Sequence, residues 1–188
     1  MSRGATSPRQ PSSWRRAALV AASLLIATGC TTVPVLAPGS DSLSGRLALR
    51  VDEFGMQPPR ALSAAFDLRG DARAGTLGLS TPLGTTLALA RWSPNEVVLT
   101  TPKGERAFAS LDELTREALG ESVPVSAWFD WLRGRPWPGA SSVGSSTGFT
   151  QVGWNVDLSH FDEGSVVATR SEPPPTVTAR IRLDRAAP

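Results

Sequence analysis

The chain is poor in the residue types that most often carry enzyme chemistry or bind metals. Its 188 residues include one cysteine, one histidine and no tyrosine. With Cys30 alone, no disulfide can form within the chain. A Ser-His-Asp triad could use only His160, no G-x-S-x-G nucleophile elbow occurs, and no acidic cluster has the spacing of metal ligands. We therefore expect no enzyme, cofactor or metal, and we expect His160 to lie in a turn between two strands.

The part of the chain after Cys30 lacks an excess of positive charge. The whole chain has 19 Lys and Arg against 17 Asp and Glu. Four of the cations precede Cys30, where no acid occurs, and removing them from the 19 leaves 15 cations against the 17 acids. These four are Arg3, Arg9, Arg15 and Arg16. A nucleic-acid-binding domain presents a basic face, so nucleic acid is not an expected partner.

The hydrophobic segment near the N-terminus is too short to span a bilayer, which needs about 20 apolar residues. It covers residues 17–26 and follows the basic pair Arg15-Arg16, which is the layout of a bacterial export signal over residues 1–29. The next residues, Ala27-Thr28-Gly29-Cys30, resemble the lipobox of bacterial lipoproteins, in which the cysteine is acylated and the signal removed. The alternative is an ordinary cleaved signal with an incidental cysteine.

Acylation of Cys30 would fix the chain to a membrane, because each buried CH₂ contributes about 0.8 kcal/mol. Thr31 follows the cysteine, whereas Asp at this position resembles an inner-membrane retention signal. The expected location is therefore the outer membrane, on its periplasmic side. Residues 30–43 are rich in Thr, Pro, Gly and Ser without hydrophobic periodicity, which predicts a tether. The folded domain is predicted over residues 44–188.

The stretch Ala74–Arg91 predicts a hairpin around which the domain is organised. Leucines alternate with small residues on both sides of a turn at residues 80–84, and period-2 spacing places such leucines on one face of a sheet. The four leucines are Leu77, Leu79, Leu87 and Leu89. Pro82 and Gly84 suit a tight turn, and Leu83 lies between them at its tip. Either Leu83 folds back over the end of the core, or it stands exposed and contacts a membrane.

Similar alternation predicts further strands. Residues 45–51 form a predicted strand with Leu47 and Leu49 on one face, and residues 61–69 form another with Phe66 on its inward face. Residues 95–100 and 105–109 form a further predicted hairpin. Six short strands thus precede any helix. Consecutive strands with short links pair antiparallel, and a sheet of this size curls toward a barrel or half-barrel. The expected fold is therefore mainly β.

Two helices follow these strands. Ser110-Leu-Asp-Glu113 is a capping box and Gly120 a stop signal, and a second helix is predicted from Pro124 to Gly134. In the second helix Trp128, Phe129 and Leu132 share a face with Val125, with Trp131 beside them. This helix either fills the core of the sheet or acts as a lid over a lipid-sized cavity. Residues 136–148 are predicted as a loop, and strands are predicted at 151–158, which includes Trp154, at 165–169 and at 177–183.

Several segments, in order along the chain, resemble the outer-membrane lipoprotein receptor family LolB. They are Gly45-Arg46-Leu47-Ala48, Leu79-Ser-Thr-Pro-Leu-Gly84, Lys103-Gly104, Leu119-Gly-Glu-Ser-Val-Pro-Val125, Trp131-Leu-Arg-Gly-Arg-Pro136 and Phe149-Thr-Gln-Val-Gly-Trp154. The resemblance implies an incomplete antiparallel barrel covered by a helical lid around a hydrophobic cavity. It also implies a chaperone-like receptor that takes lipoproteins from the soluble periplasmic carrier LolA and inserts them into the outer membrane.

Under this resemblance the Pro82-Leu83-Gly84 turn is the membrane-insertion element. The partners are a LolA-like carrier, the acyl chains of cargo lipoproteins and the inner leaflet of the outer membrane, and we expect a monomer. The residues predicted to line the cavity or its lid are Leu47, Leu49, Phe66, Leu77, Leu79, Leu87, Leu89, Trp128, Phe129, Leu132 and Trp154. The alternative function is a structural or envelope-assembly lipoprotein whose β domain only binds partners and has a solid core.

Overall fold

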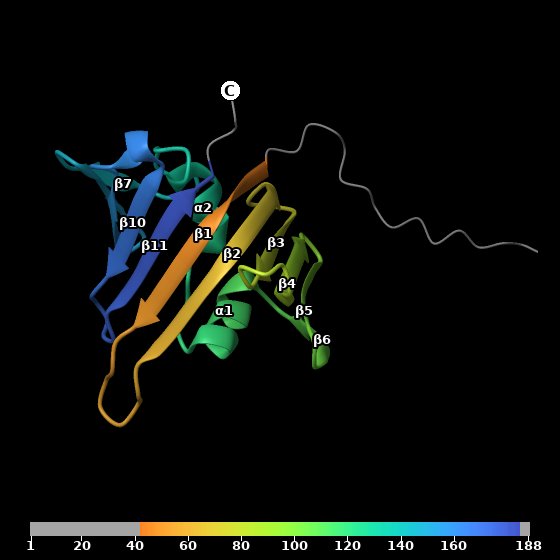
Figure 1. Ribbon diagram of the computed structural model, residues 1–188. Coiled ribbons are helices and arrows are strands. Elements are labelled where there is room, and N and C mark those ends of the chain that lie inside the picture. Colours follow the sequence, from red (N-terminus) through yellow and green to blue (C-terminus); the bar gives the residue numbers. More distant parts are fainter. Residues whose placement is uncertain (1–41, 185–188) are drawn as a thin grey trace, which may run out of the picture. The chain divides into compact units, whose positions relative to one another are not determined.

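The computed structural model describes residues 42–184, which form one antiparallel sheet with two α-helices on one side of it (Figure 1). The first run of strands is β1 (Ser42–Val51), β2 (Arg60–Gly70), β3 (Gly75–Ser80), β4 (Thr86–Ser93), β5 (Glu96–Thr101) and β6 (Gly104–Phe108). The helices α1 (Leu111–Leu119) and α2 (Val125–Trp131) come next. The second run is β7 (Ser142–Gly144), β8 (Gly148–Gln151), β9 (Trp154–Asp157), β10 (Ser165–Arg170) and β11 (Val177–Leu183), with a 3-10 turn η1 (Phe161–Glu163) before β10.

The sheet order is β6-β5-β4-β3-β2-β1-β11-β10-β9-β8-β7. Each run is a meander in which every strand pairs antiparallel with the next, as short connections dictate. β11 then pairs with β1, from Gly45 opposite Leu183 to Val51 opposite Val177. The two meanders therefore make one sheet that stays open, with β6 and β7 as its edges. This confirms the mainly β fold with six strands before the first helix, and it is compatible with a half-barrel.

The predicted alternation is confirmed in the central strands. On β1, Leu47, Leu49 and Val51 are buried, while Ala48 and Arg50 between them are exposed. The inward residues of β2 and β11 are buried in the same way and complete the central core: Ala64, Phe66 and Leu68 on β2, and Val177, Ala179 and Ile181 on β11. Both helices lie behind these strands in Figure 1, on the side of the buried face.

The ends of α1 are those that the sequence predicts. The Ser110 hydroxyl oxygen accepts a hydrogen bond from the backbone N–H of Glu113 (3.1 Å), and the Glu113 carboxylate accepts one from the N–H of Ala109 (2.7 Å). At the other end, Gly120 adopts a left-handed conformation (φ 85°) and its N–H donates to the Arg116 carbonyl. None of the helices between residues 42 and 184 is long and apolar enough to cross a membrane.

The second half of the chain departs from the prediction at three places. The strand predicted at 151–158 is divided by a turn at Val152-Gly153, where Val152 has a φ of 44°, so β8 and β9 form a hairpin. The loop predicted at 136–148 contains β7. α2 ends at Trp131, and the chain then turns to Gly134 (φ 74°). His160 lies in the turn before η1, as predicted.

Candidate functional site

The turn between β3 and β4 holds Leu83 out in solvent. The N–H of Thr81 donates to the Thr85 carbonyl (2.8 Å), and the N–H of Gly84 donates to the Thr81 carbonyl (2.9 Å). Gly84 has a φ of 84°, a conformation that favours glycine. Pro82 and Gly84 are exposed, and Leu83 is 95% exposed. Of the two alternatives for Leu83, the structure therefore excludes the one in which it folds back over the core.

An apolar pocket of about 260 Å³ lies between the first half of the sheet and the helices. α1 and the start of α2 form one wall, and β1 to β5 form the other. The lining is almost entirely carbon, with Thr101 and Thr115 as its hydroxyl-bearing members. Six of the predicted lining residues are in it, namely Leu47, Leu49, Leu77, Leu79, Leu87 and Trp128.

One residue predicted to line the cavity, Leu89, lies on the opposite face of the sheet. Leu77 lies opposite Ala90 and Leu79 opposite Ala88, whereas Leu89 lies opposite Gly78. Directly paired residues share a face of the sheet, so alanines rather than Leu89 occupy the pocket face of β4. The placement of Leu89 in the cavity was therefore wrong. The register shifts between Leu79 and Ser80, and this bulge leaves Leu87 as an extra residue whose side chain reaches the pocket.

The other predicted residues are buried but do not line this pocket: Phe66, Phe129, Leu132 and Trp154. Phe129 packs edge-on against Trp92 (6.0 Å between ring centroids), and Trp154 lies beside Trp131 (6.3 Å). Trp154 instead faces a second hollow of about 640 Å³, which Trp92 and Trp137 also line. Phe66, Phe129 and Leu132 belong to the core that positions the helices.

The pocket also has lining residues that the sequence did not predict. α1 contributes Leu111, Leu114, Ala118 and Leu119, and the sheet adds Leu62 and Leu99. Leu111, Leu114 and Ala118 recur at i, i+3 and i+7, which places them on one face of the helix, but this spacing does not indicate what the face covers. The leucines at 62 and 99 follow the same period-2 pattern as the predicted ones.

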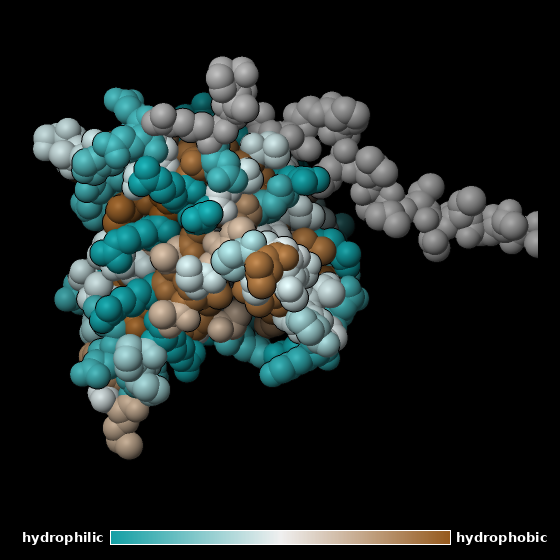
Figure 2. Space-filling model, in the orientation of Figure 1, coloured by the Kyte–Doolittle hydropathy of each residue, from teal (hydrophilic) through white to brown (hydrophobic). Residues whose placement is uncertain are grey.

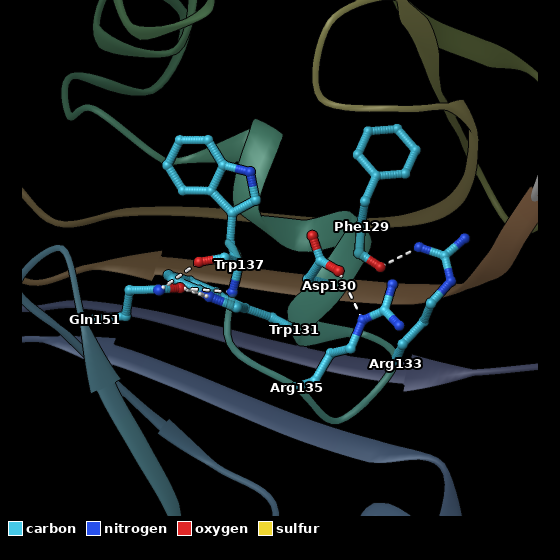
Figure 3. A network of polar contacts seen from close by, with 7 residues as sticks. All are labelled: Phe129, Asp130, Trp131, Arg133, Arg135, Trp137 and Gln151. Atoms are coloured by element: carbon cyan, nitrogen blue, oxygen red, sulfur yellow. Dashed lines mark hydrogen bonds and ion pairs between the residues drawn. The ribbon is translucent and has the colours of Figure 1, made fainter. Parts of the chain in front are cut away.

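Buried hydrogen bonds fix α2 and the loop after it to β8 (Figure 3). The Trp131 Nε1–H donates to the side-chain oxygen of Gln151 (2.7 Å), and so does the backbone N–H of Trp137 (2.9 Å). The Gln151 amide donates in turn to the carbonyls of Trp137 (2.7 Å) and Ala140 (2.8 Å). Gln151 is 2% exposed, so these bonds form away from water, where leaving any of them unmade is costly.

α1 is held differently. It faces the pocket with apolar side chains, and its ion pair to β6, between Glu117 and Arg106, lies at the surface. The segment after α1 is tied to β10 by an ion pair between Glu121 and Arg170 (2.6 Å), and both of these side chains are largely buried. One end of the α1 segment is therefore fixed, while its pocket-facing side is held by apolar contact.

Charge and titration play little part at the pocket. Among residues 42–184 there is no group of three or more His, Cys, Asp or Glu side chains that could hold a metal ion. The clearest carboxylate effects lie elsewhere: backbone N–H groups of Ala74 and Arg73 lower the pKa of Asp71, and that of Ser159 lowers the pKa of Asp157. An apolar pocket of this kind suits hydrocarbon, and none of its lining side chains is ionisable.

Comparison with known proteins identifies the family to which this chain is similar. The family model described as "Outer membrane lipoprotein LolB" matches residues 41–185. A protein of Bordetella parapertussis named outer-membrane lipoprotein LolB is 37% identical over 190 residues, which covers 93% of this chain and 94% of the relative. Proteins of the same name are 33% identical in Cupriavidus pinatubonensis (76% of this chain, 70% of the relative) and 31% identical in Chromobacterium violaceum (76% and 81%). With a family match over all of the described residues and a relative 37% identical over 93% of its length, the chain belongs to the outer membrane lipoprotein LolB family.

Proposed function

We propose that this protein is an outer-membrane lipoprotein that accepts lipoproteins from a LolA-like periplasmic carrier and inserts them into the inner leaflet of the outer membrane. The observation that carries the proposal is the apolar pocket enclosed between the open sheet and α1 in a member of this family. Such a pocket can replace water around acyl chains without specific bonds. Transfer then needs no chemical step, because the relative affinities of the two apolar sites set its direction.

The proposed signal, the anchor and all of the tether except Ser42 and Leu43 lie outside the described residues; these two, predicted as the end of the tether, are instead the first residues of β1. A signal over residues 1–29 is removed, Cys30 becomes acylated, and residues 31–41 link it to the folded domain. Acyl chains on Cys30 hold the domain permanently at the membrane. The domain is then free to tilt, and a single exposed leucine suffices to orient it.

Leu83 supplies that orientation. Burying one leucine side chain in lipid contributes about 2 kcal/mol, which is enough to bias the tilt of an anchored domain and far too little to anchor it. Its 95% exposure on a hydrogen-bonded turn supports this role.

The pocket must widen to receive cargo. At about 260 Å³ it falls below the ~300–1,000 Å³ of pockets that enclose drug-sized ligands. We propose that α1 is the lid and swings about the fixed Glu121–Arg170 pair while α2 stays bound to Gln151. The hydrocarbon of the cargo then replaces the apolar contacts that α1 gives up.

The small size of the pocket is also the observation that favours the alternative, a structural envelope lipoprotein that only binds partners. A fluorescent fatty acid separates the two functions, because it should bind the purified protein if the pocket opens. Failure of this probe to bind would favour the alternative.

Transfer itself is tested with the lipidated protein, a LolA-like carrier loaded with a lipidated cargo, and liposomes. We expect the wild type to take the cargo and deliver it. Leu83→Glu should take the cargo equally well and fail to deliver it, since a charged side chain opposes insertion. Leu83→Phe, which keeps an apolar side chain, is the matched control and should deliver normally. If Leu83→Glu delivers cargo at the wild-type rate, the role of the turn is wrong; if the wild type accepts none, the receptor function is wrong.

A further inference from the structure

The loop between β1 and β2, residues 52–59, carries two exposed apolar side chains at its tip. Met56 is fully exposed and Phe54 is 51% exposed. The tip is closed by two backbone hydrogen bonds, from Phe54 N–H to the Gln57 carbonyl (3.2 Å) and from Gln57 N–H to the Phe54 carbonyl (3.0 Å). In Figure 2 this tip, at the lower left, ends in apolar residues and stands clear of the rest of the domain. The loop therefore presents the two side chains to solvent from a closed turn.

This loop and the Leu83 turn lie at the same end of the sheet. β1 and β3 are both antiparallel to β2 and so run in the same direction. The 52–59 loop follows the end of β1, and the Leu83 turn follows the end of β3. On β2, Arg60 is level with the end of β1 and Ala65 with the end of β3. The loop therefore begins five residues, or roughly 17 Å, beyond β3.

The apolar pocket continues toward the base of this loop. A further hollow of about 290 Å³ is lined by Val51, Arg60 and Ala61 at the ends of the strands that flank the loop. It shares its remaining lining residues with the apolar pocket: Leu49, Leu62, Ala118 and Leu119. Arg60 also packs on the C-terminal end of α1, where its guanidinium lies 2.5 Å from the position of a Cβ built on Gly120. The base of the loop thus meets the end of the proposed lid.

The charges beside the tip cancel. Arg50 and Arg60 flank the loop, Asp52 and Glu53 lie within it, and Arg50 pairs with Asp52 (2.7 Å). A partner with a strongly charged face has no complementary surface here. The hydrocarbon of a bilayer does fit, because it selects for apolar side chains on a tip without net charge.

We propose that the 52–59 loop is a second membrane-insertion element, in which Phe54 and Met56 enter the same leaflet as Leu83 and bring the end of the apolar pocket onto the lipid. This inference rests on the proposed function, since it assumes that the domain works at a membrane. Two insertion points at one end of the sheet fix the tilt of the domain more fully than Leu83 alone. Acyl chains leaving between α1 and β2 would then meet hydrocarbon instead of water.

The test uses the lipidated protein on phosphatidylethanolamine–phosphatidylglycerol vesicles that contain lipids with brominated acyl chains. With Cys30 acylated, a cysteine introduced by Met56→Cys, Leu83→Cys or Val143→Cys is the only free thiol and can carry an environment-sensitive fluorophore. Val143 is the control, because it is 72% exposed and apolar but lies on β7, at an edge of the sheet. We expect quenching at positions 56 and 83 and none at 143, with no dependence on salt concentration.

The outcomes separate this inference from the proposed function. Quenching at 83 without quenching at 56 overturns the second element and leaves the proposed function standing. The absence of quenching at both positions overturns the insertion step of the proposed function as well. Quenching at 143 equal to that at 56 also overturns the inference, because the contact would then not be specific to this end of the sheet.

A functional measurement gives a second readout. Met56→Glu should slow delivery of cargo to the vesicles about tenfold, the loss expected when one apolar side chain can no longer be buried, and should leave acceptance of cargo unchanged. Val143→Glu, the matched exchange on β7, should deliver at the wild-type rate. Equal delivery rates for Met56→Glu and Val143→Glu would contradict the proposal.

Discussion

Leu83 and Asp71 show how differently two exposed turn residues serve the domain. The turn at 81–85 is held by Thr81 and Gly84, and the leucine between them makes no contribution to the core. Its presence therefore points to an interaction outside the folded domain. The side chain of Asp71, in contrast, acts inside its own turn, where its carboxylate accepts hydrogen bonds from the backbone N–H groups of Arg73 (2.7 Å) and Ala74 (3.0 Å).

Removing the Asp71 carboxylate should weaken the β2–β3 hairpin. Asp71→Ala leaves two backbone N–H groups to solvent, and because the site is exposed we expect a loss of less than about 1 kcal/mol in the free energy of unfolding. The same turn positions the carbonyl of Asp71, which accepts a hydrogen bond from the indole N–H of Trp92 (3.1 Å). Urea denaturation of wild type and variant at neutral pH measures the difference.

The sign of the pH dependence follows from the lowered pKa of Asp71. A carboxyl group with a lower pKa in the folded state than in the unfolded state stabilises the fold above its unfolded pKa, and this contribution is lost as pH falls through the folded value. The difference between wild type and Asp71→Ala should therefore be constant near neutral pH and shrink in acid, below about pH 4. A difference that grows in acid would contradict this role.

At the scale of the element, β4 marks the limit of what sequence periodicity can predict. The alternation of leucines in residues 74–91 correctly predicted two strands and the turn between them. The same alternation predicted that Leu89 faces the pocket, which was wrong, because the bulge at Leu79/Ser80 shifts the pairing by one residue. A shift of one residue moves a side chain to the other face of the sheet. No single-strand pattern contains this information, since a bulge is a property of two paired strands.

Adjacent residues on β4 therefore give a sharp test of the pocket. Ala88 lines it and Leu89 lies on the other face. Ala88→Phe should fill the pocket and abolish uptake of a fluorescent fatty acid, at a cost to stability of about 1–3 kcal/mol from overpacking. Leu89→Phe is the control, with the same introduced side chain on the opposite face, and should bind the probe like the wild type. Thermal melting of both variants shows whether each has folded, and equal uptake by two folded variants would place the binding site elsewhere.

The helices were predictable to different degrees. The capping box at Ser110 and the stop signal at Gly120 correctly predicted the two ends of α1, because both signals depend only on neighbouring residues. The apolar residues of α2 correctly predicted burial, but the sequence could not distinguish a core plug from a lid. Gln151 decides how α2 is held, and it lies on β8, 20 residues from its partner Trp131. A polar residue in a predicted strand gave no sign of that contact.

At the scale of the whole described domain, the connection that matters most joins its first and last strands. The meanders could be predicted because neighbouring strands pair through short turns, but the pairing of β1 with β11 links residues 126 to 138 positions apart. Only this ladder combines the two meanders into one sheet. The curved surface behind α1 and α2 therefore depends on a contact that no local pattern in the sequence specifies.

Gly45 is the position at which that ladder can be tested. A Cβ built on Gly45 would lie 2.1 Å from the carbonyl oxygen of Arg182 on β11, so any larger residue must push the two strands apart. We expect Gly45→Val to lower the free energy of unfolding by about 1–3 kcal/mol, measured as a lower midpoint in urea. Ala48→Val places the same side chain on the outer, exposed face of β1 and should change the midpoint little. If both variants unfold at the same urea concentration, close packing between β1 and β11 does not limit the stability of the sheet. If only Gly45→Val is destabilised, and its uptake of a fatty acid also falls, then the pairing of β1 with β11, which joins the two meanders, shapes the apolar pocket.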